Sequence, residues 1–528
     1  MSIEKKLIDD IKQEYLEEKN KKQNTIKNMW TQYQKMGKEL SEGIYAEDNH
    51  FIYELIQNAE DTISIENTHS LEFELENEGL LVFNNEMGFN EEQIKAICSF
   101  GQSTKAIEKN EGYIGEKGIG FKSVFKITDK PAIYSNGYRF YFNRFDESGT
   151  TTEYIIPYWI DDNILKQYPL KFQNNTHTTL YLPFSKDQKH ENITKLRDGI
   201  KHIEPILLLF LKKLTNIKIS ESGKNVINTV KTSQKDEQLD VINIQNKNIT
   251  EHYYVFNKSI EVDSNLDEVK DKNGRRKNVF KREIILAFPD LNKNKIKEDR
   301  IFSFLPTKLH SELEFIIQAD FILQSGRENI AIDNDWNKWQ FNEIEKFISY
   351  EIISALKNHT KLKLKYFNYF TRNGNSHNSL IEKLYTNIIN YLKTNNTILA
   401  ENDTWQKPQN IILFEENIKI DTKYLKLLFG KESEQVHEKF ELDQYFINKF
   451  QIKKITKKEV IEKICDYFDS KALNDFSKKE VLYFTQFLGK YLNIDSRALS
   501  FEKELFERVK ESLPILPKYK NEKKLYLC

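Results

Sequence analysis

HFIYELIQNAEDTI, residues 50–63, has the spacing of an α-helix with two chemically different faces. The apolar face consists of Ile52, Leu55, Ile56 and Ala59. The opposite face carries Glu54, Asn58 and Asp61 at positions i, i+4 and i+7. A carboxylate beside an amide oxygen suits a magnesium–nucleotide site, because Mg²⁺ takes few protein oxygens together with phosphates and water. Glu54 could then accept a proton from attacking water. The alternative is an ordinary amphipathic helix whose polar face is solvated.

A turn with the sequence NNEMGF, residues 84–89, follows the short strand LLVFN. Gly88 permits a backbone geometry that side chains hinder. At the strand end, the side-chain oxygen of Asn84 can accept a hydrogen bond from an exocyclic amino group such as that of adenine. Since asparagine is neutral, a flipped Asn84 would instead offer its amide hydrogens. Taken alone, such a turn is common.

A glycine-rich segment, GYIGEKGIGFKSVF at residues 112–125, comes next along the chain. Its glycines allow close backbone approach, and a helix that starts just after them would point backbone N–H groups at a phosphate. The pattern is not the P-loop, because GxxxxGK[ST] is absent from the sequence. Nearby cations are supplied by Lys105, Lys117 and Lys122, although in a lysine-rich chain a single lysine is usually a surface residue.

The surrounding pattern indicates an α+β protein. Between residues 50 and 183, helices alternate with short strands predicted at 71–75, 80–84, 138–143 and 178–184. An apolar helix predicted at 192–214 would serve as a stiff connector. Strands return at 215–333, interrupted by the charged stretch 267–283, and the remainder is mainly helical.

The composition limits the class of protein. With 528 residues the chain has room for about three folding units. Basic and acidic residues nearly cancel, giving a formal charge of -1, so no whole-chain field favours nucleic acid or membranes. Three scattered cysteines argue against a disulfide framework and suit the cytoplasm. Neither a signal core nor a run of about 18 apolar residues is present, which predicts no membrane association.

Taken in order, the three segments resemble the GHKL superfamily of ATP-binding proteins, which includes gyrase B subunits, HtpG-type chaperones, histidine kinases and MutL. Glu54-x-x-x-Asn58-x-x-Asp61 resembles the N box of that superfamily, Asn84 to Phe89 its adenine-side box, and Gly115 to Gly120 its phosphate-side box. The sequence of these segments resembles the sacsin-like and NO VEIN-like branch more closely still. That resemblance covers residues 40–145 strongly and extends in dilute form to about residue 345.

The resemblance implies an N-terminal Bergerat α/β sandwich followed by a transducer-like domain. The predicted domains are an N-terminal helical segment (1–45), an ATP-binding domain (46–190), a transducer-like middle domain (191–360) and a mainly helical C-terminal region (361–528). Residues 396–414 and 511–528 look faintly alike, so the chain could be part of a longer protein. Residues 1–45 would pack on their own domain or act as a strap in a homodimer.

The resemblance also implies roles for single residues, with ATP and Mg²⁺ as cofactors. Glu54 would be the general base, Asn58 the Mg²⁺ ligand, and Asp61 part of the pocket wall. Asn84 stands where most of the superfamily has the aspartate that binds the adenine amino group, and Glu86 replaces an expected glycine. The other residues that would contact the nucleotide are Gly88, Phe89, Ser103, Lys105, Gly115, Lys117, Gly118, Ile119, Gly120 and Phe121.

Three further residues come from the same resemblance. Thr179 resembles the buried threonine beneath the adenine, although any strand would favour a β-branched residue there. Arg327, in LQSGRENI, is the candidate cation that the middle domain would donate to the γ-phosphate, and Lys308 is the second candidate.

Three functions follow as hypotheses. In the first, the chain is a Mg²⁺-dependent ATPase that uses lid closure and domain rearrangement in a chaperone-like or defence-related machine. In the second it is a nucleotide-sensing interaction module that scarcely hydrolyses ATP. In the third it is a nucleic-acid-linked clamp, for which the basic segment 273–283 is the best local support. The client, a protein or a nucleic acid, is left open by the sequence.

Overall fold

The structure is a computed structural model that divides the chain into two compact units. The first unit is Met1–Phe347 with Arg372–Glu382, and the second is Ile348–Thr371 with Lys383–Cys528. The residues that it describes are 2–20, 50–62, 64, 68–99, 120–145, 154–173, 177–185, 190–201, 203–270, 276, 279–291, 299–324, 329–372, 378–415, 418–470, 476–491, 508–509 and 512.

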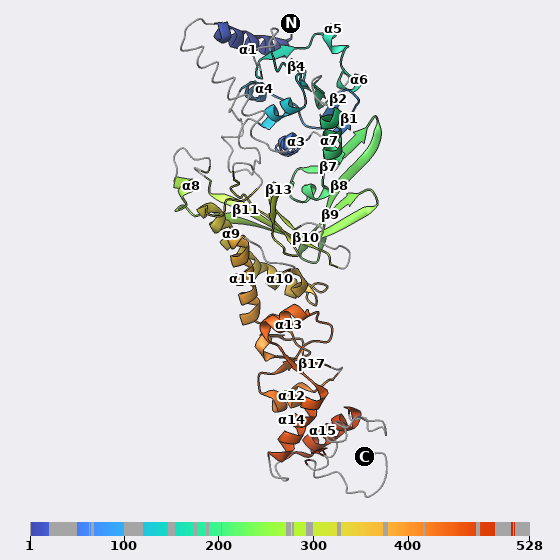
Figure 1. The fold of residues 1–528 in the computed structure, drawn as a ribbon, viewed down its shortest axis with the longest axis vertical. Helices are drawn as coiled ribbons and strands as arrows, with labels where there is room; N and C mark the ends of the chain where they lie inside the picture. The colour runs from blue at the N-terminus through green and yellow to red at the C-terminus, as the bar shows by residue number, and fades with distance from the viewer. Residues whose placement is uncertain are drawn as a thin grey trace. The chain divides into compact units, whose positions relative to one another are not determined.

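The first unit is built on one large mixed sheet, in agreement with the predicted α+β class (Figure 1). Its strands are ordered β13-β12-β14-β11-β10-β9-β8-β7-β1-β2-β6-β3-β4-β5 within the described residues. Their bounds are β1 His69–Leu75, β2 Gly79–Asn84, β3 Ala132–Ser135, β4 Tyr138–Phe142, β5 Pro157–Trp159, β6 Thr178–Pro183, β7 Leu214–Glu221, β8 Lys224–Asp236, β9 Leu239–Asn246, β10 Ile249–Glu261, β11 Lys281–Pro289, β12 Arg300–Ser303, β13 Leu305–His310 and β14 Ile316–Gln318.

The helices of the first unit are mostly short. They are α1 Ile3–Asn20, α3 His50–Glu60, α4 Glu91–Ile97, the 3-10 helix η2 Gly120–Lys126, α5 Asp162–Leu165, α6 Leu170–Gln173, α7 His190–Lys201, the 3-10 helix η3 Pro205–Leu209, α8 Asp267–Lys270 and α9 Asp335–Phe347. The four strands expected near residues 71, 80, 138 and 178 form as β1, β2, β4 and β6.

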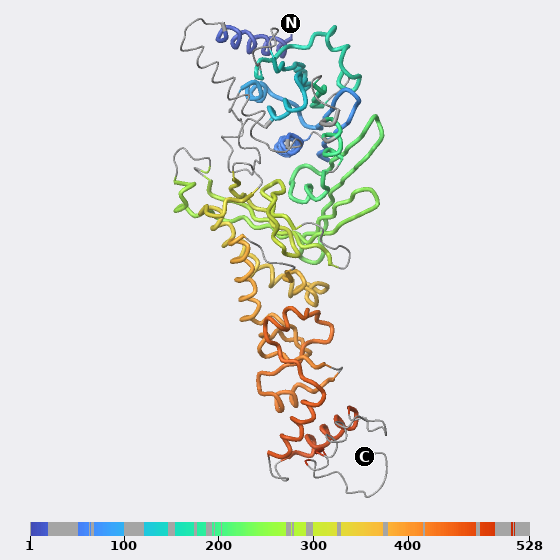
Figure 2. The backbone as a smooth tube through the Cα atoms, viewed as in Figure 1, coloured from blue at the N-terminus to red at the C-terminus, as the bar shows by residue number. Residues whose placement is uncertain are grey.

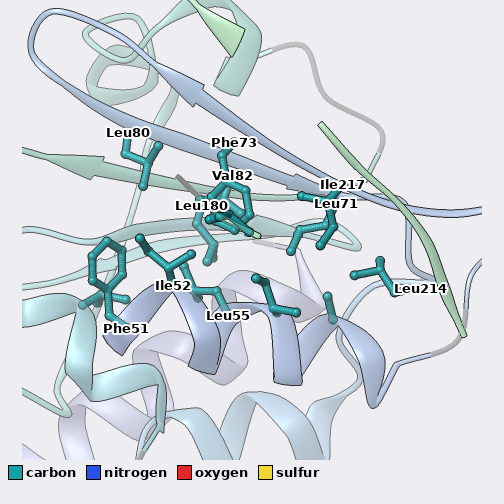
Figure 3. Close-up of a cluster of buried hydrophobic side chains, with 14 of the residues drawn as sticks. Phe51, Ile52, Leu55, Leu71, Phe73, Leu80, Val82, Leu180, Leu214 and Ile217 are labelled. Carbon is teal, nitrogen blue, oxygen red and sulfur yellow. The ribbon is translucent and has the colours of Figure 1, made fainter. Parts of the chain in front are cut away.

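Two faces of the sheet bury different side chains. The helix α3 lies under one face, where Val82 and Leu180 pack towards Leu55 (Figure 3). The other face packs a smaller cluster around Leu81 and Phe172. Because side chains alternate along a strand, every residue of β1, β2 and β6 belongs to one face or the other.

The sheet continues without a break past the first group of strands. β7 pairs in parallel with β1, from His69 opposite Leu214 to Leu75 opposite Glu221. From β7 the chain runs through long antiparallel hairpins, β7–β8 and β9–β10, which form the long green loops of Figure 2. The predicted ATP-binding and middle regions therefore share one hydrogen-bonded sheet.

The prediction of an apolar helix at 192–214 is wrong for the second half of that range. α7 ends at Lys201, Glu204 is extended with φ -76° and ψ 127°, and η3 begins at Pro205. A residue before proline is disfavoured in the helical region, so Pro205 ends the helix that the apolar pattern would have continued. Leu214 then opens strand β7 instead of closing a connector.

The helix α1 packs on its own domain. Ile8 is fully buried and Ile11 nearly so, and Lys5 forms an ion pair of 2.7 Å with Asp161, just before α5. This packing agrees with the first alternative for residues 1–45, in which the segment packs on its own domain. The later part of that segment, from residue 21, lies outside the described residues.

The second unit combines helices with five short strands in its described residues. Its elements are the π-helical turn η4 Ile348–Ile352, α10 Ile353–Asn358, η5 Tyr366–Phe370, α11 Ser379–Thr394, η6 Pro408–Asn410, α12 Thr422–Phe429, α13 Gln444–Phe450, α14 Lys457–Asp469, α15 Lys478–Tyr491 and the strands β15 Ile398–Leu399, β16 Trp405–Gln406, β17 Ile411–Phe414, β18 Glu434–Gln435 and β19 Lys453–Ile455. The first four residues of α11 belong to the first unit. Across the described residues of both units, no helix has the length and apolar character needed to cross a membrane.

Candidate functional site

The helix α3 presents polar side chains that are buried. Glu54 is 6% exposed and Asp61 is 8% exposed, whereas Asn58 is partly exposed. A solvated polar face would leave carboxylates in water, so the amphipathic-helix alternative does not describe α3. Burial of carboxylates is costly unless polar partners compensate.

One buried acid of this helix was missed by the sequence reasoning. The carboxylate of Glu60 accepts hydrogen bonds from the backbone N–H groups of Lys212, Lys213 and Leu214, at donor–acceptor distances of 2.6, 3.0 and 2.8 Å. These amides lead directly into β7. The signal was present, because Glu60 falls one helical turn after Ile56 on the apolar face. A charge on a buried face predicts a specific partner.

The end of β2 places Asn84 against the end of α3. Asn84 lies opposite Thr178 of β6 and Leu71 of β1 in the strand register. Its side-chain Oδ1 is 2.9 Å from Nε2 of His69, and its Nδ2 donates to Oγ1 of Thr62 at 3.3 Å. The predicted adenine contact is therefore a buried amide held between His69 of β1 and Thr62, which lies just after the end of α3.

The turn after Asn84 is fixed by its neighbours. The side chain of Asn85 accepts from Ser70 N–H at 2.8 Å and donates to the carbonyl of Thr68 at 2.7 Å. Gly88 has a φ of +83°, and a Cβ there would lie 2.7 Å from Cβ of Asn136, so a side chain is excluded twice over. The backbone N–H of Phe89 donates to Oγ of Ser135 at 2.8 Å.

In the register of β2 and β6, the threonine that lies beside Asn84 is Thr178, one position before the predicted Thr179. Thr179 is fully buried, but it pairs with Phe83 and faces the cluster around Leu81 and Phe172, away from α3. Thr178 pairs with Asn84 and faces the same side as it does. Its Oγ1 lies 2.6 Å from Oγ of Ser135, which also receives the Phe89 amide. The hydroxyl beside Asn84 therefore belongs to Thr178.

The described part of the phosphate-side box lies against α3. η2, which begins at Gly120, packs on this helix, and Phe121 is half-buried with its ring 6.0 Å from that of Phe142. The remaining predicted residues of this box and of the lid lie outside the described residues; they are Ser103, Lys105, Gly115, Lys117, Gly118 and Ile119.

Lys122, one of the three lysines noted near the glycine-rich segment, is turned into the core. Its Nζ donates to the carbonyls of Ile97 at 2.7 Å and Tyr154 at 2.9 Å, and it lies 4.0 Å from the ring centre of Phe142. Burial lowers the pKa of Lys122 to about 7, and burial raises the pKa of the neighbouring Cys98 thiol to about 12. Lys122 thus ties the end of α4 to η2.

The two candidate cations of the middle region are placed unequally. Arg327 lies outside the described residues, and Lys308 is exposed on β13, the edge strand of the sheet. Two arginines of the basic segment 273–283, the support for the nucleic-acid clamp, form ion pairs within the protein. Arg276 and Arg282 both bind the buried carboxylate of Asp320, at 2.7 and 2.5 Å.

That carboxylate belongs to a larger structural cluster. The guanidinium of Arg276 lies 4.6 Å from the ring centre of Trp336, whose Nε1 donates to the Asp320 carbonyl at 2.7 Å. Asn337, also on α9, bonds the backbone of Ile322 and Ala331 on the two sides of a short hairpin. These arginines therefore hold the base of that hairpin.

No three His, Cys, Asp or Glu side chains gather as metal ligands among the described residues. On the face of α3 that the predicted pocket would use, Asn58 is partly exposed and lies between the buried Glu54 and Asp61. A single amide oxygen of this kind fits Mg²⁺, which keeps several water and phosphate ligands.

Comparison with known proteins gives a partial family assignment. Residues 33–147 match the Sacsin domain family model. The chain is 30% identical over 399 residues to the protein NO VEIN of Arabidopsis thaliana, a stretch that covers 71% of this chain and 14% of that protein. It is 24% identical over 379 residues to human sacsin, covering 56% of this chain and 8% of sacsin. The similarities support a sacsin-like family, and the chain spans a small fraction of either relative.

Proposed function

We propose that the sacsin-like region of this chain binds ATP with Mg²⁺ and hydrolyses it. Glu54 would be the general base, Asn58 the Mg²⁺ ligand, and Asn84 the contact to the base. The observation that carries the proposal is the meeting of three segments: the buried polar face of α3, the end of β2 and the start of η2. The resemblance of these three segments to nucleotide-binding boxes gives that meeting its chemical meaning.

In the proposed hydrolytic step, Glu54 of α3 acts on the attacking water. Water attacks the γ-phosphorus and forms a new P–O bond, while the bond to the bridging oxygen of ADP breaks. The Glu54 carboxylate accepts the proton that the water loses and later releases it to solvent. Bound Mg²⁺ would neutralise charge on the phosphate oxygens. Because phosphoryl transfer depends mainly on position and electrostatics, a buried, fixed carboxylate suits this role.

The fold also supports coupling between nucleotide binding and the middle region. Glu60 is held by the amides of residues 212–214, so a movement of α3 would pull on the start of β7. β7 is hydrogen-bonded to β8, and the hairpins continue from there. We propose that this connection carries the rearrangement of a chaperone-like or defence-related machine.

Phosphate release and nucleotide binding test the proposal together. Glu54→Ala should keep ATP affinity within a few-fold of wild type and lower the turnover number by about 10²-fold or more, the usual contribution of a general base. Glu92→Ala is the matched control, because Glu92 is an exposed glutamate of the same domain. Binding of ATP without phosphate release by wild type would favour the nucleotide-sensing module. Failure of wild type to bind ATP in calorimetry would reject the proposal.

A further inference from the structure

Four polar groups form a cluster at the junction of α3, β1 and β2, in which Oγ1 of Thr62 also lies 3.5 Å from Nε2 of His69. Oγ1 of Thr62 lies 2.7 Å from the carbonyl oxygen of Ala59, and Nδ2 of Asn84 lies 3.3 Å from the same Oγ1. Oδ1 of Asn84 lies 2.9 Å from Nε2 of His69. His69 is 4% exposed and Asn84 is 8% exposed, so water competes little for these contacts.

The direction of each hydrogen bond in this cluster is fixed by chemistry. A carbonyl only accepts, so Thr62 must spend its single hydroxyl proton on Ala59. Oγ1 of Thr62 can then only accept, and the nearer of its two neighbours is Nδ2 of Asn84 at 3.3 Å, with Nε2 of His69 at 3.5 Å. The Nδ2 end of the amide therefore faces Thr62. Oδ1 of Asn84 consequently faces His69, and Nε2 of His69 must carry a hydrogen to donate to it.

The other ring nitrogen agrees with this assignment. Nδ1 of His69 is buried and meets no hydrogen-bonding partner among the described residues, as expected for a nitrogen without a hydrogen in a neutral ring. Burial lowers the pKa of His69 below its ordinary value, although the hydrogen bond with Asn84 opposes that shift. The ring is therefore neutral at pH 7, in the tautomer with hydrogen on Nε2.

We propose that His69 is a positioning residue that locks the Asn84 amide in one orientation and thereby makes the site selective between purines. The inference rests on the proposed nucleotide function. After its two contacts, Asn84 retains one hydrogen on Nδ2 and one lone pair on Oδ1. The pairing edge of adenine presents an amino donor beside a ring-nitrogen acceptor, whereas guanine presents a carbonyl acceptor beside an N–H donor.

An amide that could rotate by half a turn would serve either edge equally. In the locked amide, the same rotation would set Nδ2 against the Nε2 hydrogen of His69 and Oδ1 against the lone pairs of Thr62. Both contacts would become repulsive, and both hydrogen bonds would be lost. One orientation therefore persists, and with it a preference for adenine over guanine that does not need the carboxylate used by related proteins.

Competitive binding of ATP and GTP tests the lock. Wild type should prefer ATP at least tenfold, and His69→Phe, which keeps a planar ring but cannot donate, should reduce that preference to about threefold or less. His69→Gln, which restores a donor, should recover most of the selectivity. His252→Phe is the matched control, because His252 forms a similar pair of 2.6 Å with Asn243 on β9 and β10. It should leave the ratio unchanged.

The outcomes separate this inference from the proposed function. Equal loss of ATP and GTP affinity in His69→Phe, with the ratio preserved, would overturn the lock while leaving nucleotide binding in place. Absence of binding in wild type would overturn both. Histidine ¹⁵N spectra of the nucleotide-free protein provide a readout that does not depend on nucleotide: a neutral ring with hydrogen on Nε2 supports the lock, and a charged ring or hydrogen on Nδ1 at pH 7 overturns it.

Discussion

The end of α3 and the base of the 320–331 hairpin each bury a carboxylate, and they stabilise it by opposite means. Glu60 is held by backbone amides of residues 212–214, which carry no net charge. Asp320 is held by the guanidinium groups of Arg276 and Arg282, stacked near Trp336. Amides bind an acid without neutralising it. The hairpin base neutralises its acid, which marks it as a structural centre.

This difference bears on where ligand chemistry belongs. The proposed pocket, with Glu54 and Asp61 in it, would repel the phosphates of a nucleotide unless a cation accompanied them. The proposed Mg²⁺ requirement therefore follows from charge as well as from resemblance. The arginines of the hairpin base are engaged with Asp320, which weakens the nucleic-acid clamp hypothesis for segment 273–283.

Removing Asp320 should give the largest change in stability. Asp320→Ala leaves two partly buried guanidinium groups without their carboxylate, and breaking such a buried pair costs about 3–5 kcal/mol. The free energy of unfolding in urea measures this loss. Asp335→Ala, which removes an exposed carboxylate paired with Lys338, should cost about 1 kcal/mol or less. Equal effects of the two substitutions would refute the structural role of the hairpin base.

The buried amine of Lys122 should make stability depend on pH in the alkaline range. Its pKa is lowered from 10.5 to about 7 in the folded protein, so between these values the unfolded chain binds more protons. Stability must then rise with pH across that window, by about 1.4 kcal/mol for each pH unit. From pH 7 to pH 9.5, wild type should gain about 3 kcal/mol relative to Lys122→Met.

Urea unfolding at several pH values checks the Lys122 prediction. The comparison uses only the difference between the two proteins, because other groups titrate in both. Parallel stability curves for wild type and Lys122→Met between pH 7 and 9.5 would mean that Lys122 keeps an ordinary pKa. Lys122 would then resemble Asp320 in being a charge that its neighbours stabilise in the folded state.

Changing Glu60 tests the amide-held acid directly. Glu60→Gln keeps the shape but removes the charge that attracts the three amides, and hydrogen bonds to charged groups contribute about 1.5–3 kcal/mol. We expect a loss of about 2 kcal/mol and faster hydrogen exchange at residues 212–214. Glu72→Gln is the control, since Glu72 pairs with Lys218 at 2.8 Å on the opposite face of the same strand pair. It should leave exchange at 212–214 unchanged.

The smallest expected effect distinguishes two adjacent threonines. Thr178→Val removes the hydroxyl that shares a face with Asn84, and ATP affinity should fall about tenfold, or about 1.4 kcal/mol. Thr179→Val removes a hydroxyl on the far face and should leave ATP affinity unchanged. Calorimetric titration of both variants with ATP provides the measurement. A larger loss with Thr179→Val would restore the assignment drawn from the sequence.

Local patterns predicted the parts of the fold that depend on local sequence. The alternation in LEFEL and LLVFN identified β1 and β2, and the spacing in residues 50–63 identified α3. The helix predicted after residue 192 was too long, because the prediction followed the apolar periodicity and disregarded Pro205. The order of the strands could not be read from the sequence, since the parallel pairing of β1 with β7 joins segments about 145 residues apart.

The site residues also divide into those predicted from local sequence and those that depend on how the sheet assembles. Glu54, Asn58, Asp61 and Asn84 were named from their own segment, and the fold brings their segments together. Thr178 and Thr179 could not be separated without the register between β2 and β6. Glu60 and His69 were missed because their partners are fixed only when the sheet assembles. The roles of Glu54, Asn58, Asp61 and Asn84, and those of Arg327, Lys105 and Lys117, stay predictions.

The parallel pairing of β1 with β7 has a consequence for how this protein can be divided. A fragment that stops before Leu214 would leave β1 paired with β2 on one side and open on the other, where its outward-facing main-chain groups would lack partners. Such an edge recruits other strands, so that fragment would be prone to aggregation. A fragment that continues through β7 would close this edge, and the acid of Glu60 would keep its amides. For limited proteolysis and for expression, the proposed ATP-binding region therefore ends in β7 or beyond.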